Sequence, residues 1–522
     1  MSTPLDLYRP GVAAGRDAQV LHRAAMPAFS GWLEHIRPAG GCARPIRLTG
    51  TLAAVERDTG RVLGEQHTDE LPDGALYKAC GNRREARCPD CAWVYAGDAY
   101  QVVRCGLTGG KGVPASVGRH PVVFATFTAP SFGAVHHRHV PRHTCATRQR
   151  CDCRSAPCRA RSTAGTCPHG QPAACFARHD ADDPRLGQPL CLDCYDHAHQ
   201  VVWNYFSGEL WRRTKQAIER HLAALCRRRG IPLVRVVTAS GRVRWVPPVR
   251  VSHGKVAEMQ RRAAVHFHVL LRLDGIDPDD PHAFVPPPAG ITVNDLETAL
   301  YAAASQITVT TPPHPDRPQG WLIAWGEQVD VRRINTASGE LTDGKVAAYL
   351  AKYATKATEA TGHSFTRLTP AIIDDYADPE GDHLPRLIDA CWRLGRPTHD
   401  LTTSGATTTD GRQGSLDAKP NAYAGLRRWA HMLGFGGHFL TKARRYSVTF
   451  RLLRDTRATH RRTEDDEPAD TITVGTLTYI GAGWLTDGDA LLANTAAQQR
   501  RESRRIGREE LAHEAWLTGA AA

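Results

Sequence analysis

The chain has 522 residues, of which 41% are hydrophobic and 7% aromatic, a composition that predicts roughly two to four folded domains and excludes a disordered protein. Its 66 Lys and Arg residues against 54 Asp and Glu residues give a net charge of +12, which favours a polyanionic partner such as nucleic acid. Because the sequence has no N-terminal signal core and no apolar run of about 18 residues, we expect a soluble, cytoplasmic protein without a membrane span.

Zinc-binding patterns dominate the N-terminal part of the chain. Residues 1–75 contain no motif and are expected to form an N-terminal region of unknown role. Twelve of the 15 cysteines lie between Cys80 and Cys194, in Cys-x-x-Cys and Cys-Pro-His patterns that predict structural Zn²⁺ in a reduced chain. We therefore expect a first zinc-binding segment at 76–118 and a Cys/His-rich zinc-binding insertion at 134–200.

Two zinc knuckles supply two ligands each and need two more. The first is Cys88-Pro-Asp-Cys91, which Cys80 is expected to join, with Cys105 or a residue of the later cluster completing the site. The second is Cys191-Leu-Asp-Cys194. The candidates to complete it are Cys167, His169, Cys175 and His179. Four further cysteines are expected to build another site or to stay free: Cys145, Cys151, Cys153 and Cys158.

Apolar periodicity predicts a sheet domain that the insertion interrupts. The run His120–Pro130, within residues 119–133, predicts a first strand that ends at a proline. After the insertion, Leu210–Arg229 has apolar residues at helical spacing. Further strands are expected at 232–238, 242–251, 255–260, 264–273 and near 321–333, with a helix near 293–306. Over 201–362 this order predicts an α+β fold, an antiparallel sheet with helices packed on one face.

A histidine pair on one predicted strand is a candidate metal site. Period-two alternation from Ala264 to Leu271 places four apolar side chains on one face and the imidazoles of His266 and His268 on the other, about 7 Å apart, where one ion can take both rings. The preceding strand folds Glu258 or Gln260 back beside the rings. Glu258 is the favoured third ligand because a carboxylate neutralises a hard divalent cation. Alternatively, the histidines are ordinary polar residues of a sheet.

A tyrosine- and lysine-rich segment supplies candidate nucleophiles. Residues 345–356 lack Gly and Pro and predict a helix, on which Tyr349 and Tyr353 share one face while Lys352 and Lys356 line an adjacent one. A phenol with a pKa of about 10 is a poor nucleophile unless its phenolate is stabilised, as lysines and a metal-polarised phosphate can do. Alternatively, the tyrosines pack and the lysines are solvated.

The C-terminal region, 363–522, is expected to be an α/β extension and a candidate for DNA binding. Residues 404–418 and 459–470 have the composition of linkers. A helix is expected over Leu426–Phe435, a basic strand over Arg444–Leu453, and a polar, Arg-rich helical tail at 487–517.

Several of these segments resemble the HUH endonuclease superfamily. His266-Phe-His268 and the pattern from Tyr349 to Lys356 are similar to its second and third motifs, and Val122–Thr128 resembles its first motif, an apolar strand ending in Thr-x-Thr. Four segments resemble the rolling-circle replication initiators of actinobacterial plasmids and integrative elements: Cys80–Cys91, Cys167–Gly170, Leu190–Asp196 and Gly208–Arg213. The resemblance covers residues 76–360, with weaker similarity to residue 455.

The resemblance implies a metal-dependent nickase and strand transferase. Such an enzyme cuts one strand of origin DNA, single-stranded or hairpin with flanking duplex, leaving a 5′-phosphotyrosine and a 3′-hydroxyl primer for a host DNA polymerase. Tyr353 matches the primary nucleophile and Tyr349 the second tyrosine, with Mg²⁺ or Mn²⁺ at the histidines. The sequence has no Walker motif, so a host helicase is expected to separate the strands. Ala263-Ala264 stands where many relatives have a turn glycine.

Two alternatives fit the same residues. A conjugative relaxase or a single-strand transposase would use the same chemistry on a different DNA. A non-catalytic, zinc-dependent DNA-binding regulator would contain histidines and tyrosines whose role is only structural.

Overall fold

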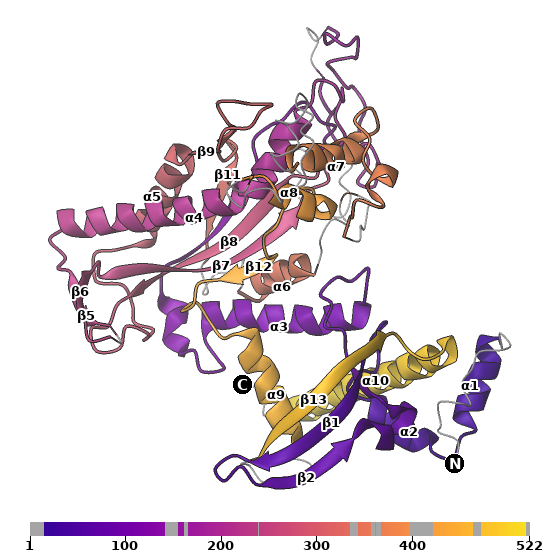
Figure 1. Cartoon of the computed structure of the whole chain (residues 1–522). Helices are drawn as coiled ribbons and strands as arrows, with labels where there is room; N and C mark the ends of the chain where they lie inside the picture. Colours follow the sequence, from indigo (N-terminus) through magenta and orange to yellow (C-terminus); the bar gives the residue numbers. More distant parts are fainter. Residues whose placement is uncertain are drawn as a thin grey trace, which may run out of the picture. The chain divides into compact units, whose positions relative to one another are not determined.

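The protein folds into two compact units, which Figure 1 shows in a computed structural model. The structure describes residues 15–140, 155–160, 165–238, 240–334, 343–355, 361, 367–396, 421–462 and 471–517. Unit 1 contains Met1–Asp98 and Thr449–Ala522, and unit 2 contains Ala99–Val448. The boundaries expected after residues 75, 118 and 362 do not separate these units, because both ends of the chain contribute to unit 1.

Unit 2 is built on a five-stranded antiparallel sheet, so the expected α+β class with an antiparallel sheet is confirmed. Strand β8 (Val265–Gly275) lies at its centre and pairs with β4 (Val122–Phe127) and β7 (Val249–Met259). The outer strands are β11 (Val329–Arg333), beside β4, and β12 (Leu440–Lys442), beside β7. The register places Glu258 of β7 opposite His266 of β8.

Helices cover both faces of this sheet, so the prediction of helices on one face is wrong. On one face, α4 (His197–Arg228) and α5 (Val293–Gln306) enclose a core with odd-numbered β8 residues such as Phe267. On the other face, Leu270 packs with residues of α6 (Asp343–Ala354) and of the C-terminal half of α3 (Pro89–Thr108). The physical reason is that the histidine face of β8 is buried as well, through Leu270 and the ion pair of Arg272 with Asp274, so it also needs a cover.

Two short hairpins flank the main sheet. Strands β5 (Val234–Val237) and β6 (Val243–Val246) form a separate two-stranded sheet, as do β9 (Val309–Thr310) and β10 (Leu322–Ile323). Helix α5 has the expected bounds, whereas α4 begins well before the expected helix, with the side chain of Asp196 accepting a hydrogen bond from His199 N (2.8 Å).

Unit 1 joins the two ends of the chain in one sheet. Strand β1 (Ile46–Glu56) pairs with β13 (Thr471–Ala482) along its whole length, and with β2 (Val62–His67) and β3 (Leu76–Lys78). Its longer helices are α1 (Arg16–Ala24), α2 (Phe29–Ile36), α9 (Phe450–Arg462) and α10 (Asp487–Leu517). Helix α10 confirms the expected helical tail, whereas β13 was not expected from the sequence.

Other C-terminal expectations are only partly met. The basic strand expected over Arg444–Leu453 is wrong, because residues 444–446 form a turn and α9 begins at Phe450. The helix expected over Leu426–Phe435 is reduced to one turn, α8 (Gly425–Arg428), and a 3-10 turn that Leu433 ends with a φ of +54°. Helix α7 (His383–Leu394) precedes them. Residues 404–418 and 463–470 lie outside the described ranges.

Among the helices of the described ranges, none combines the length and apolarity needed to cross a membrane.

Candidate active site and metal centres

The two histidines of β8 lie on the sheet face that α6 covers. Their ring centroids are 4.5 Å apart. Glu258 Oε2 lies 3.0 Å from His268 Nε2, and Gln260 Nε2 lies 3.1 Å from His266 Nδ1. The structure therefore brings both candidate third ligands to the histidine pair, one to each ring.

The surroundings of the rings favour neutral imidazole at His266. Burial, together with the nearby His268 and Arg262, lowers the pKa of His266 to about 3. Neutral imidazole is the form that binds metal ions. The ring of His268 stacks on Phe124 with centroids 5.7 Å apart, and its Nδ1 lies 3.2 Å from Thr126 Oγ1. Strand β4 thus orients the second ring.

The turn before the histidine strand is held by residues that sequence reasoning missed. Ala263 has a φ of +64°, in the left-handed region that favours glycine. The buried Asn204 amide donates to Ala263 O (3.0 Å) and accepts from Val265 N (3.0 Å). Arg262 Nε donates to Gln260 Oε1 (3.0 Å). No local sequence signal identifies Asn204, because it reaches the turn from α4.

Helix α6 brings both candidate tyrosines to the histidine pair. The Tyr349 hydroxyl lies 3.4 Å from His268 Nε2, and the half-buried Tyr353 has its ring centroid 5.8 Å from that of His268. The two tyrosine rings are 4.7 Å apart. Burial raises the pKa of Tyr349, and the nearby Tyr353 and Glu258 raise it further. The Tyr349 hydroxyl thus lies within reach of the His268 ring.

The two candidate lysines are described unequally. Lys352 is exposed on α6, between the two tyrosines in sequence. Lys356 lies outside the described residues.

Three groups of Cys and His side chains in the described part of the chain have ligand atoms within 4.8 Å of one another, as a tetrahedral metal site requires. Cluster 1 is Cys42, Cys80, Cys88 and Cys91; cluster 2 is His136, Cys158, Cys175 and His179; cluster 3 is Cys167, His169, Cys191 and Cys194. All three could hold a metal ion. The pair His266 and His268 is not among these groups.

Cluster 1 differs from the expected first site in one ligand. Its fourth member is Cys42, from the segment before β1, whereas Cys105 is buried in unit 2 and belongs to none of the clusters. Backbone amides donate to two of the sulfurs, Cys80 N to Cys42 Sγ (3.2 Å) and Ala43 N to Cys88 Sγ (3.3 Å). Such donors stabilise thiolate, the form that binds zinc. The lone Cys42 has no spacing pattern that could have signalled this role.

Cluster 2 takes two residues that the sequence had placed with the second knuckle. Cys175 and His179 meet His136 and Cys158 because Cys175 pairs in an antiparallel bridge with Arg159, next to Cys158. His179 Nδ1 lies 2.7 Å from Asp183 Oδ2. A carboxylate on the second ring nitrogen is the usual outer-shell partner of a metal-bound histidine, and fits a zinc ligand here.

Cluster 3 completes the second knuckle with two of its expected candidates. His169 Nδ1 lies 3.2 Å from Cys194 Sγ and 3.7 Å from Cys191 Sγ. Burial raises the pKa of Cys167, but backbone hydrogen bonds from Gln171 and His169 outweigh it and lower the pKa to about 7. The thiolate is therefore accessible at neutral pH.

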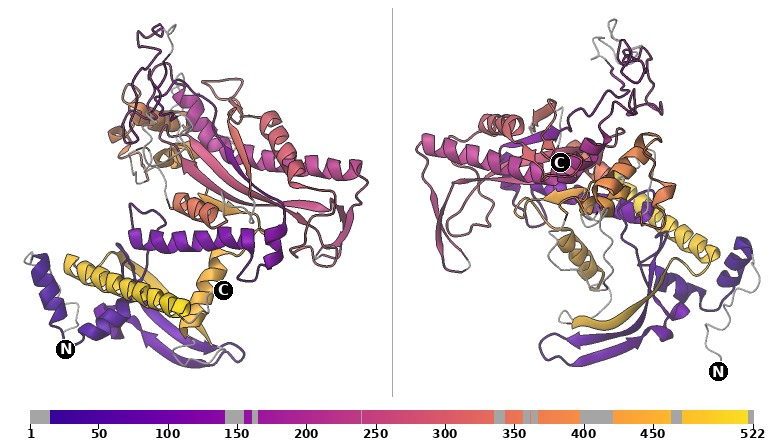
Figure 2. Two further views of the ribbon diagram at one scale, coloured as in Figure 1. Left: turned by 180° about the vertical axis from the view of Figure 1, so that it is seen from behind. Right: turned by 45° about the horizontal axis from the view of Figure 1, so that its top comes forward.

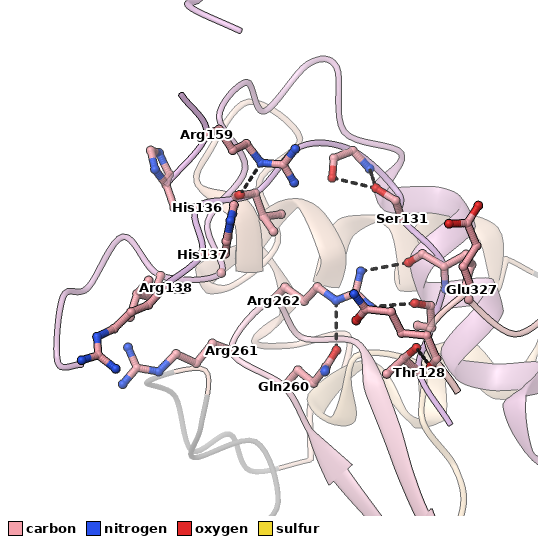
Figure 3. A pocket seen from close by; sticks show the side chains of 18 of the residues that line it. Thr128, Ser131, His136, His137, Arg138, Arg159, Gln260, Arg261, Arg262 and Glu327 are labelled. Carbon is pink, nitrogen blue, oxygen red and sulfur yellow. Dashed lines mark hydrogen bonds between the residues drawn. The ribbon is translucent and has the colours of Figure 1, made fainter. Parts of the chain in front are cut away.

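A cavity of about 810 Å³ lies between cluster 2 and the turn before the histidine strand (Figure 3). Gln260, which contacts His266, and His136, a member of cluster 2, both line it. Four arginines contribute to its wall: Arg138, Arg159, Arg261 and Arg262. This concentration of guanidinium groups suits an anion such as a DNA phosphate.

Comparisons with known proteins agree on one family. A family model described as RepSA, replication initiator protein, pSAM2, matches residues 28–498. A replication initiator protein of Streptomyces ambofaciens is 38% identical over 518 residues, which cover 96% of this chain and 97% of the relative. No solved structure matches the chain.

Proposed function

The chain belongs to the RepSA family of replication initiator proteins, and from this premise we propose that it starts replication by nicking one strand of origin DNA. The proposed enzyme is a tyrosine-type endonuclease and strand transferase of the HUH class that supports rolling-circle replication of a plasmid or integrative element. The observation that carries the proposal is the meeting of two tyrosines with a histidine pair on one face of the sheet.

In the proposed reaction, Tyr353 is the primary nucleophile. Its phenol oxygen forms a bond to the scissile phosphorus while the bond from phosphorus to the 3′ oxygen breaks. The phenol loses its proton, the 5′ phosphate stays on the tyrosine, and the 3′ oxygen takes up a proton to become the primer hydroxyl. Tyr349 receives the displaced strand when a round ends. The exposed Lys352 stabilises the negative charge of the phosphate oxygens.

His266, His268 and Glu258 would hold a Mg²⁺ or Mn²⁺ ion. The donor set fits such an ion, because the ring of His266 is neutral and Glu258 supplies a carboxylate beside His268. When bound, the ion offsets negative charge on the phosphate in the transition state. Gln260 is the alternative third ligand.

We further propose that the three Cys/His clusters hold structural Zn²⁺. The arginines of the cavity beside cluster 2 would bind backbone phosphates of the strand to be cut. A host helicase and a host DNA polymerase would then open and copy the origin.

The experiment that tests this function is adduct formation on origin single strand. Wild type, Tyr353→Phe and the matched variant Tyr349→Phe are incubated with the oligonucleotide and Mn²⁺ or Mg²⁺. Protein–DNA adducts are resolved on denaturing gels and located by peptide mapping. We expect an adduct on Tyr353 in wild type, its loss in Tyr353→Phe with DNA binding retained, and first-strand cleavage in Tyr349→Phe. If wild type forms no nick while still binding DNA, the protein is a zinc-dependent regulator instead.

A further inference from the structure

The segment that leads from α4 into the sheet has an unusual charge pattern. From Arg220 to Ala257 the sequence contains eight arginines and one lysine but no Asp or Glu. The middle of this segment holds the paired strands β5 and β6, which together with Arg242 we call the β5–β6 ribbon. Figures 1 and 2 show its two strands past the C-terminal end of α4. A polyanion is the partner that such a segment attracts.

One face of the ribbon carries large side chains that the protein does not cover. The strand register pairs Arg235 with Trp245 and Val237 with Val243, so these four side chains share a face. Trp245 is 63% exposed, and Val237 and Val243 are each 47% exposed. Val236, on the opposite face, is buried, so the ribbon packs on one side and presents the other to solvent.

The charges of the ribbon are not neutralised within the described structure. No described acidic side chain forms an ion pair with Arg235, Arg242 or Arg244, and all three are exposed. By contrast, Arg229, just before the ribbon, pairs with Asp295 at 2.8 Å. Exposed guanidinium groups without an acidic partner are available to an external acceptor.

We propose that the β5–β6 ribbon binds duplex DNA by entering its major groove. That groove admits a two-stranded β-ribbon, and an arginine can donate two hydrogen bonds to guanine O6 and N7. Arg235, which shares a face with Trp245, would contact guanine edges, and Trp245 and its valine neighbours would contact thymine methyl groups. Arg244, opposite Val236 on the other face, and Arg242, just before β6, would contact phosphates. The ribbon would thus recognise the duplex that flanks the nick site, a task separate from cutting the single strand.

Duplex DNA fits better than the other possible partners. A protein partner would have to bring acidic groups for each arginine and an apolar patch between them. A single strand is normally bound in a groove with stacking platforms, whereas the exposed ribbon offers one tryptophan on an open face.

The test measures binding to origin duplex and to the corresponding single strand across a range of salt concentrations. The variants are Arg235→Ala for the base contact, Arg244→Ala for a phosphate contact and Trp245→Ala for the apolar contact. The matched control is Arg212→Ala, an exposed arginine on α4 that pairs with Glu209. We expect the ribbon variants to bind duplex about tenfold more weakly. Their affinity for the single strand and their thermal unfolding midpoint should match those of wild type, and the control should show no change. Removal of an arginine that contacts a phosphate should lower the magnitude of the salt slope by about one.

A chemical change in the DNA tests the groove itself. In duplex with 7-deazaguanine, which lacks the N7 acceptor, the wild type should bind about tenfold more weakly at a contacted guanine, and the matching arginine variant should lose nothing further. Equal losses for duplex and single strand, or duplex affinity unchanged in every ribbon variant, would overturn the proposal. Because these readouts are affinities, they hold whether or not the nicking reaction is observed.

Discussion

At the residue level, the two neighbours of the histidine rings have different roles. The amide nitrogen of Gln260 faces His266 Nδ1, and its oxygen accepts from Arg262, so both ends of this side chain are engaged. Glu258 keeps a carboxylate beside His268. In the proposed metal site, Glu258 would therefore be the ligand and Gln260 would orient the His266 ring.

This assignment predicts unequal effects on metal-dependent nicking. Glu258→Gln is expected to abolish activity at any Mn²⁺ concentration, because the site loses its anionic ligand. Gln260→Ala is expected to raise the Mn²⁺ concentration for half-maximal nicking about 10- to 100-fold, the usual effect of losing an outer-shell partner. Nicking rates across a Mn²⁺ titration measure both effects. The reverse order of severity would make Gln260 the ligand.

A second residue pair predicts how stability depends on pH. Burial lowers the pKa of His197 to about 3 and that of His383 to about 4, from a usual value of 6.5. His383 Nε2 donates to Arg262 O (3.1 Å), and its Nδ1 lies 3.1 Å from His197 Nε2, so both rings are neutral in the fold. Between these values the unfolded chain binds more protons than the folded one, and stability must fall as the pH falls.

We expect the free energy of unfolding of unit 2 to decrease from pH 6.5 to pH 4. Each histidine contributes a slope of up to about 1.4 kcal/mol per pH unit. His383→Gln keeps a donor and an acceptor but cannot bind the proton, so its denaturant midpoint should depend less on pH. A variant with the same pH dependence as wild type would show that other groups cause the loss.

Local spacing therefore predicts some site residues and not others. The pairs His266/His268 and Tyr349/Tyr353 were visible in the sequence because each lies on one strand or one helix. Cys42 and Asn204 were not predicted, since each joins its site across a long sequence separation that no local pattern records.

At the element level, Tyr446 joins the sheet to α3. Its ring lies against Gly254 of β7, and its hydroxyl donates to Val103 O of α3 (3.2 Å). A Cβ on Gly254 would lie 2.9 Å from the Tyr446 ring, closer than packing allows. The glycine therefore allows the close approach of helix and sheet on the histidine face.

Gly254→Ala is expected to destabilise unit 2 by about 1–3 kcal/mol, the usual range for overpacking. Gly208→Ala is the matched control, since nothing lies within 4 Å of a Cβ at this exposed position in α4 and alanine favours helix. Denaturant unfolding compares the two. Equal stability of both variants would mean that Tyr446 moves without penalty.

The same sheet face holds a buried ion network at the far end of β8. Asp274 accepts from Arg272 Nε (2.7 Å), His120 Nδ1 (2.8 Å) and Ser252 Oγ (2.6 Å). Burial opposes its ionisation, but the hydrogen bonds from His120 and Arg272 outweigh burial and lower the pKa of Asp274 to about 2.

Asp274→Asn is expected to destabilise unit 2 by about 3–5 kcal/mol, because Arg272 would keep a buried charge without its partner. Asp330→Asn, which removes an exposed ion pair with Arg332, should change stability by less than about 1 kcal/mol. A loss in Asp274→Asn as small as in this control would contradict a structural role for the network.

Element types were predicted better than their arrangement. Residue patterns placed β4, β8 and α5, because each has a clear hydrophobic period. The strands expected at 242–251 and 255–260 are wrong in their bounds, since β7 runs unbroken over Val249–Met259. They could not show which sheet face each helix covers, since the histidine face of β8 is mostly polar in sequence and yet buried in the fold. The strand expected near Arg444 was wrong, because the chain turns at residues 444–446 to bury the Tyr446 ring in the core of unit 2.

At the level of the whole molecule, the clusters predict a metal content. Wild type is expected to contain three Zn²⁺ per chain, one for each cluster. Cys42→Ser should contain two and Cys105→Ala three, because of these two cysteines only Cys42 is a cluster member. Atomic emission measures the content. Chelation should unfold the segments that clusters 1–3 hold together, seen as increased proteolysis between residues 42 and 194. Loss of zinc in Cys105→Ala but not in Cys42→Ser would contradict the ligand assignment.

The division of the chain into two units could not be predicted from the sequence. The pairing of β1 with β13 joins segments that are more than 400 residues apart, and no local pattern in either strand identifies the other as its partner. Domain boundaries read from composition therefore treated the two ends of the chain as separate regions.

That pairing also orders events during synthesis. When the ribosome has translated residue 448, every residue of unit 2 has been made, but β1 still lacks the strand that covers its length. Unit 1 can close only after residues 471–482 leave the exit tunnel, so its N-terminal half waits while the rest of the polypeptide is made. A message cut short before that point would yield the histidine and tyrosine residues without a finished partner unit.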